Sequence, residues 1–202
     1  MAIMASAKGN SFDPISEGVH IGVCTNIIDI GEQWSEIYGK SSRKVMLTWE
    51  LPDETVRIDG EDKPRYISKE YTLSLNEKAV LRQHLEAWRG KKFTDEELQG
   101  FDLRKVLGVG CQIQVIHNDR GYANIASIMS LPKGMPAPKP CGEKIYFDLT
   151  EPGCLDQMDK LPGWIADKVK KSTTYQDIVD AQADTDGDGF VEEDSDEGQL
   201  PF

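Results

Sequence analysis

The sequence predicts an all-β domain that is interrupted by a helical insert and followed by an acidic tail. Three observations lead to this prediction. Apolar and polar residues alternate over three early segments, the spacing then changes to that of a helix, and the alternation returns over two later segments. At 202 residues, the chain has room for one well-buried domain with appendages, so we expect a single core.

The three early segments are expected to be strands. Residues 17–30 (EGVHIGVCTNIIDI) are rich in β-branched side chains, which favour extended backbone. Residues 44–51 (KVMLTWEL) alternate between polar and apolar side chains, and Pro52 is expected to end this strand. Residues 65–75 (RYISKEYTLSL) show the same alternation.

The helical insert begins after the third strand. Asn76 is a candidate N-cap for a helix over residues 76–90, and Gly90 stands where a C-terminal cap is expected. Thr94 and Glu97 have the spacing of a capping box, which predicts a short second helix.

Alternation and helical spacing also predict which large aromatic residues are buried. Trp49 shares a strand face with apolar neighbours, and Trp88 falls on the apolar stripe of the helix, so both are expected in the core. Tyr71 is expected to be buried for the same reason. Tyr66 lies on the polar parity of its strand, which predicts an exposed ring.

The last two segments, residues 111–117 and 122–131, are separated by a polar turn and predict a hairpin. Five strands with a helix between the third and fourth is the arrangement of an OB-fold, a partly open five-stranded barrel. We therefore divide the chain into an N-terminal arm (1–14), an OB-fold domain (15–131), a Pro-rich linker with a C-terminal extension (132–176), and an acidic, disordered tail (177–202).

The charge of the protein is concentrated in this tail. The whole chain has a formal net charge of -12. Its last 22 residues contain no Lys or Arg and eight carboxylates: Asp184, Asp186, Asp188, Glu192, Glu193, Asp194, Asp196 and Glu197. An acidic chain would normally argue against a nucleic-acid partner, but here the imbalance describes mainly the tail.

Several classes of protein are not supported by the sequence. We find no apolar run of membrane-spanning length and no signal-peptide pattern, so we expect a cytoplasmic protein without membrane contact. Four widely spaced cysteines predict reduced structural thiols. Phosphate-loop, nucleophile-elbow and zinc-protease motifs are missing, which predicts a protein that is not an enzyme and needs no cofactor.

Three groups of residues have the chemistry of a single-strand binding surface, which combines cations for phosphates with flat rings for bases. The groups lie between the first two strands, on the third strand and at the last hairpin. They are Trp34, Tyr38, Lys40, Arg43 and Lys44; Arg65, Tyr66 and Lys69; and Arg120 and Tyr122. An OB topology is expected to bring them into one groove.

A calcium site is the main alternative. Asp184, Asp186 and Asp188 match the first ligands of an EF-hand loop, but Ser195 stands where a bidentate Glu is required. We therefore attribute the match to the EF-hand ligands to the acidic composition of the tail, and we expect no metal.

The end of the chain, EEDSDEGQLPF, resembles the acidic tail of bacterial single-stranded DNA-binding proteins and of their equivalents in tailed bacteriophages. Residues 74–94 (SLNEKAVLRQHLEAWRGKKFT) are similar to the phage proteins in particular. The resemblance implies sequence-nonspecific binding and protection of single-stranded DNA in replication, recombination and repair, inside a bacterial host cell.

The resemblance also implies that the tail recruits replication and repair proteins. The residues it implicates are Asp194, Asp196, Glu197, Leu200, Pro201 and Phe202. The extension over 132–172 departs from the bacterial family, so the number of subunits stays open and a homo-oligomer is compatible with the sequence. A calcium-binding or protein-interaction module on an OB scaffold remains the alternative function.

Overall fold

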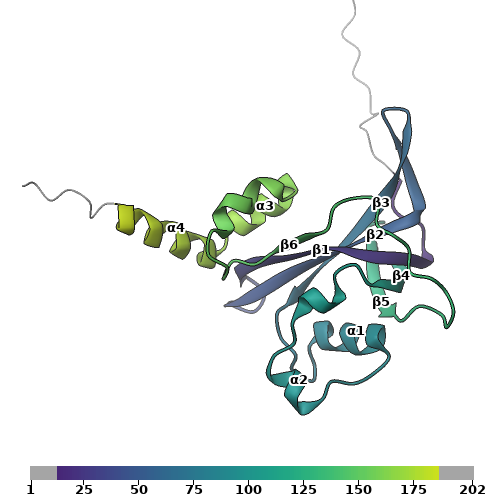
Figure 1. The fold of residues 1–202 in the computed structure, drawn as a ribbon, viewed down its shortest axis with the longest axis horizontal. Coiled ribbons are helices and arrows are strands. Elements are labelled where there is room, and N and C mark those ends of the chain that lie inside the picture. The colour runs from purple at the N-terminus through teal and green to yellow at the C-terminus, as the bar shows by residue number, and fades with distance from the viewer. Residues whose placement is uncertain (1–12, 187–202) are drawn as a thin grey trace, which may run out of the picture.

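The computed structural model describes residues 13–186 and contains a mostly antiparallel, six-stranded sheet (Figure 1). The strands are β1 (Gly18–Ser35), β2 (Lys40–Ile58), β3 (Glu61–Thr72), β4 (Gly110–His117), β5 (Ala123–Met129) and β6 (Ile145–Phe147). Their order across the sheet is β3-β2-β1-β4-β5, and β6 pairs with β1 in parallel. The prediction of a mostly β protein with helices is confirmed.

Helices lie on both sides of this sheet (Figure 1). They are α1 (Val80–Arg89), α2 (Asp95–Gln99), α3 (Gly163–Lys170) and α4 (Thr173–Asp186), with 3-10 turns at Leu103–Val106 and Cys154–Lys160. The insert between β3 and β4 packs on one face, and the C-terminal extension packs on the other. In the described part of the chain, no helix is both long and apolar enough to cross a membrane.

The expected barrel is not closed. Among residues 13–186, β3 and β5 are the two edges of the sheet, and no ladder joins them. They approach each other through Lys69, whose Nζ donates a hydrogen bond to the backbone oxygen of Ile125 at 2.8 Å. Burial lowers the pKa of Lys69. The lysine therefore serves as a tether between the two edges.

The first core lies between the sheet and the helical insert. Trp49 of β2 and Trp88 of α1 are both buried, and their ring centroids are 5.9 Å apart. Tyr71 is buried in the same core, whereas Tyr66 is exposed. All four predictions from alternation and helical spacing are confirmed.

The insert confirms two predicted caps and changes one boundary. Gly90 ends α1 in the left-handed region (φ 66°), and Thr94 with Glu97 forms the capping box of α2. The N-terminus of α1 differs from the prediction. It begins at Val80 after Ala79, which provides no side-chain cap, so Asn76 is not the N-cap.

Strand β2 also continues beyond its predicted end. Pro52 does not terminate it, because the register with β3 shifts between Leu51 and Thr55 and leaves the proline inside that irregularity. The strand then runs to Ile58 and turns through Asp59 and Gly60, both at positive φ. The segment between the second and third predicted strands is thus an extended hairpin.

A second core lies between the outer face of the sheet and the extension. Ile28 and Met46 of the sheet are buried against Phe147 of β6 and against Ile165 and Val169 of α3. This packing is apolar on both sides, so it excludes water from the outer face of β1 and β2. The extension is therefore a layer of the fold.

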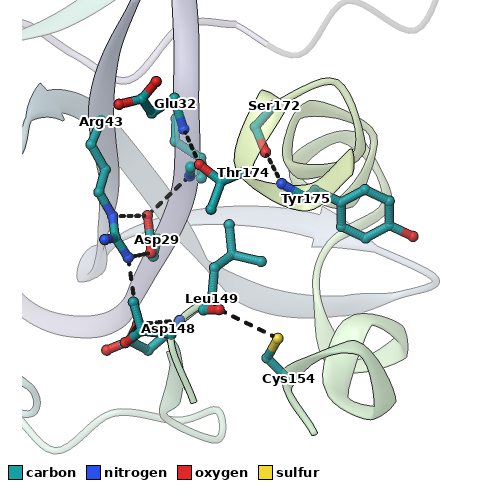
Figure 2. Close-up of polar contacts among 12 residues, drawn as sticks. Asp29, Glu32, Arg43, Asp148, Leu149, Cys154, Ser172, Thr174 and Tyr175 are labelled. Carbon is teal, nitrogen blue, oxygen red and sulfur yellow. Dashed lines mark hydrogen bonds and ion pairs between the residues drawn. The ribbon is translucent and has the colours of Figure 1, made fainter. Parts of the chain in front are cut away.

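Polar contacts fix the edge of this second core (Figure 2). The guanidinium of Arg43 pairs with Asp29 and lies 3.8 Å from Asp148, which joins β2 and β1 to the extension. The backbone N–H of Glu32 donates to the Thr174 hydroxyl at 2.9 Å. These contacts tie the extension to the β1–β2 hairpin.

The boundary of the tail is different from the predicted one. Helix α4 continues to Asp186, so residues 177–186 are helical and do not belong to a disordered tail. Ser172 at its start is buried, and its hydroxyl accepts a hydrogen bond from the Tyr175 N–H at 3.1 Å, which caps the first turn (Figure 2). Residues 187–202 lie outside the described part of the chain.

The second core predicts that Ile165→Ala lowers the free energy of unfolding by about 2–5 kcal/mol, because it opens a cavity under α3. Urea unfolding measures this change. Ile116→Ala removes the same atoms from a residue that is exposed on β4, and it is expected to change stability by less than about 0.5 kcal/mol. Equal, small effects from both variants would contradict an integral extension.

His84 predicts a pH dependence of stability. Burial, and then Lys69, lower its pKa from 6.5 to about 4. Its neutral Nδ1 lies 2.8 Å from the Tyr71 hydroxyl and accepts that hydrogen bond. Below about pH 6.5 the unfolded chain binds a proton that the folded protein does not, so stability is lost as the pH falls from about 6.5 to about 4.

Because the His84 ring is half-buried, we expect a loss of about 1–2 kcal/mol over this range. Urea unfolding at a series of pH values, compared between the wild type and His84→Gln, isolates the contribution. The variant should show a flatter profile. Parallel profiles would show that His84 does not titrate between the two states.

Candidate nucleic-acid interface

Three exposed aromatic rings meet in one groove on the surface. The exposed fractions are 49% for Tyr66, 67% for Tyr122 and 57% for Trp164. The groove has a volume of about 460 Å³. We call it the aromatic groove, and its walls include Ile15, Arg65, Tyr66, Ser68, Tyr122 and Trp164.

Each ring reaches the groove from a different element. Tyr66 stands on the face of β3 that points away from the first core, because Ile67 occupies the inward position. Tyr122 follows the turn between β4 and β5, where Gly121 has a φ of 78°. Trp164 is in the first turn of α3, on the side opposite the buried Ile165 and Val169.

The Tyr66 ring is held in place by a buried carboxylate. The Tyr66 hydroxyl donates to Glu50 Oε2 at 2.9 Å, and the Cys141 N–H donates to Glu50 Oε1 at 2.8 Å. Burial, and then Glu50, raise the pKa of Tyr66 to about 12, so the ring stays neutral. Glu50 thus fixes both the tyrosine and the segment that leads into the extension.

The electrostatics of the aromatic groove favour an anion at its rim. Arg65 is the charged side chain among the described groove residues, and its Nη2 donates to the backbone oxygen of Asp13 at 2.6 Å. Because this partner is a carbonyl group, the guanidinium keeps its net charge. Arg120 is exposed in the turn beside Tyr122. The groove therefore combines three aromatic rings with one lining cation, Arg65, and has Arg120 in the adjacent turn.

The predicted residues of the first group do not enter this groove. Trp34 and Tyr38 are 65% and 75% exposed at the end of the β1–β2 hairpin, and Lys40 is exposed beside them. Trp34 pairs with Ser41, whereas Tyr66 pairs with Glu50. These two positions on β2 are about 30 Å apart at roughly 3.3 Å per residue. The three predicted groups therefore form two sites.

Three predicted cations are engaged within the protein. Arg43 pairs with Asp29, Lys44 Nζ lies 2.6 Å from Glu70 Oε1, and Lys69 bonds to β5. Hydrogen bonding to Asp29 raises the pKa of Arg43. These partners lie far from the three cations in the sequence. The sequence therefore suggested phosphate contacts, whereas the fold gives the three cations structural roles.

A second groove with cations lies on the opposite side of the sheet. It has a volume of about 350 Å³ and is lined by Arg89, Lys91 and Lys105. The Arg89 guanidinium lies between two phenyl rings, at 4.5 Å from Phe93 and 4.8 Å from Phe101, and pairs with Glu97. Because Arg89 and the two phenyl rings are engaged with one another, Lys91 and Lys105 are the cations that this groove offers to an anion.

The acidic end of the chain is described only in part. Asp184 and Asp186 belong to the last turn of α4, whereas Asp188 lies outside the described residues. Residues 13–186 contain no cluster of His, Cys, Asp or Glu side chains that could hold a metal ion. The tail residues implicated in partner binding (Asp194, Asp196, Glu197, Leu200, Pro201 and Phe202) also lie outside this part.

Trp164 is the groove residue that sequence reasoning missed. Its signal is present in the sequence, because a helix that buries Ile165 and Val169 must turn Trp164 outward. An outward tryptophan on an amphipathic helix is unusual enough to suggest a binding role. What the sequence does not reveal is that the start of α3 lies beside Tyr66 in the aromatic groove.

Comparison with known proteins adds no relative. The chain matches no protein-family model, and a search of curated proteins finds no match either.

Proposed function

We propose that this protein binds single-stranded DNA without strong sequence preference, through the aromatic groove, and protects it during replication, recombination or repair. The observation that carries the proposal is the convergence of Tyr66, Tyr122 and Trp164, from three separate elements, next to Arg65. Bases of any sequence stack on such rings, while cations follow the phosphates. Binding of this kind requires no catalytic group or cofactor.

The geometry of the rings supports stacking over a purely structural role. An aromatic ring that is exposed to water adds little to the stability of the fold, yet all three rings are roughly half exposed or more. Glu50 restrains the Tyr66 ring, so less conformational entropy is lost when a base stacks on it. The groove is thus prepared for a flat ligand.

We further propose that the sheet is an OB-fold whose barrel is completed by side-chain contacts between β3 and β5. The strand order and the helix between β3 and β4 support this assignment. The resemblance of the tail to phage and bacterial single-stranded DNA-binding proteins supports the same function. The same resemblance implies that the protein acts in the cytoplasm of a bacterial host.

The acidic tail would then serve a second role. We propose that Leu200, Pro201 and Phe202, with the preceding carboxylates, bind basic pockets on replication and repair proteins. A flexible polyanion can also compete with DNA for the protein's own cations. Both roles depend on the same local excess of negative charge.

A fluorescence titration with oligo(dT) at two salt concentrations tests the proposed function. Trp34 and Trp164 are exposed, so stacking of bases should quench tryptophan emission. The affinity should fall about tenfold or more between about 50 and about 200 mM salt, because phosphate contacts release counterions. No change in emission together with no salt-sensitive binding would refute the proposal, and calcium binding in that case would favour the calcium or protein-interaction alternative.

Substitutions at Tyr122 test the role of the rings. Tyr122→Ala should weaken oligo(dT) binding by about 1–3 kcal/mol, which is about five- to 150-fold, because one stacking platform is lost. Tyr122→Phe keeps the ring and should bind with nearly wild-type affinity. Since Tyr122 is 67% exposed, neither change should unfold the protein. Equal affinities for the Ala and Phe variants would exclude stacking at this position.

A further inference from the structure

Helix α3 lies between the two exposed aromatic sites of the molecule. At its start, Trp164 lines the aromatic groove. At its end, the backbone oxygen of Lys168 accepts a hydrogen bond from Gln33 Nε2 at 3.1 Å. Gln33 is the neighbour of Trp34 on the β1–β2 hairpin. The helix has eight residues and is therefore about 12 Å long, so it covers part of the distance of about 30 Å between Tyr66 and the end of the hairpin.

The sheet beneath α3 offers no passage for a nucleic acid. Ile28 and Met46 are buried there against Ile165 and Val169. A strand that contacts both aromatic sites therefore cannot pass between α3 and the sheet.

That outer surface carries a row of suitable side chains. Trp164, Lys168 and Lys171 are spaced at i, i+4 and i+7, which places them on one side of a helix. Ile165, Ala166 and Val169 occupy the opposite side and are buried. We call Trp164, Lys168 and Lys171 the α3 strip.

The charge of the α3 strip remains positive despite an ion pair. Lys168 and Lys44 both pair with Glu70, so two cations share one carboxylate. Lys171 is exposed, and it makes no ion pair with any residue in the described part of the chain. Asp167 is exposed beside the strip and is the carboxylate that opposes an approaching phosphate.

We propose that single-stranded DNA leaves the aromatic groove, follows the α3 strip, and ends on the hairpin residues Trp34 and Tyr38. This inference rests on the proposed function, because it extends the path of the same ligand. It assigns the C-terminal extension a direct part in binding. It also assigns a role to the exposed hairpin rings, which lie about 30 Å from the groove.

Two substitutions of opposite sign test the α3 strip. Lys171→Gln should weaken binding of an oligo(dT) of about 16 nucleotides by about three- to tenfold and reduce the slope of log affinity against log salt by about 0.7. Asp167→Asn should strengthen binding by a similar factor. An oligo(dT) of about 4 nucleotides fits in the groove alone, so neither change should affect it by more than about twofold.

Lys92→Gln is the matched control, because Lys92 is exposed after α1 on the opposite side of the sheet and the charge change is the same. It should leave both affinities unchanged. If the wild type binds but Lys171→Gln and Asp167→Asn both match it on the longer strand, the strip is refuted and the proposed function stands. If the wild type shows no salt-sensitive binding to either strand, the proposed function fails, and the strip fails with it.

Discussion

The packing of the C-terminal extension on the outer face of β1 and β2 is the interaction on which the rest of this structure depends. It buries Ile28 and Met46, which would otherwise form an apolar patch facing water. It also positions Trp164 at the end of the sheet where Tyr66 and Tyr122 emerge. Without this second core, the aromatic groove would have only two of its three rings.

The folded sheet also engages several of its own carboxylates. Carboxylates on the sheet are used internally: Asp29 pairs with Arg43, Glu70 pairs with two lysines, and Glu50 accepts hydrogen bonds from Tyr66 and the Cys141 N–H. Asp29 and Glu70 are thereby balanced by cations, whereas Glu50 is satisfied by hydrogen bonds. Eight of the 35 acidic residues lie in the last 22 residues of the chain, where the sequence has no Lys or Arg to balance them.

Much of the fold could be predicted from local patterns. The alternation around Trp49 and Tyr71 predicted their burial, and the spacing of Thr94 and Glu97 predicted the cap of α2. Burial on the outer face of the sheet was harder to predict. Met46 lies on the same side of its strand as polar residues, so the sequence gives no sign of a second core. The end of β2 was predicted wrongly, since a register shift accommodates Pro52 inside the hairpin.

The candidate site could be predicted only in part, for a related reason. The exposure of Tyr66 follows from local alternation, but the engagement of Arg43 and Lys44 depends on Asp29, Asp148 and Glu70. Such pairs form only in the folded chain, so a short stretch of sequence does not reveal them. The contribution of Trp164 depends on the start of α3 lying beside Tyr66 and Tyr122, which is a tertiary feature.

Photochemical cross-linking of an iodouracil-substituted oligonucleotide, followed by mass spectrometry of the peptides, tests most directly whether the extension forms part of the binding surface. The account predicts cross-links at Tyr66, Tyr122 and Trp164, with the Trp164 adduct located in α3. Cross-links confined to the side of α1 and α2, with none in the extension, would contradict it.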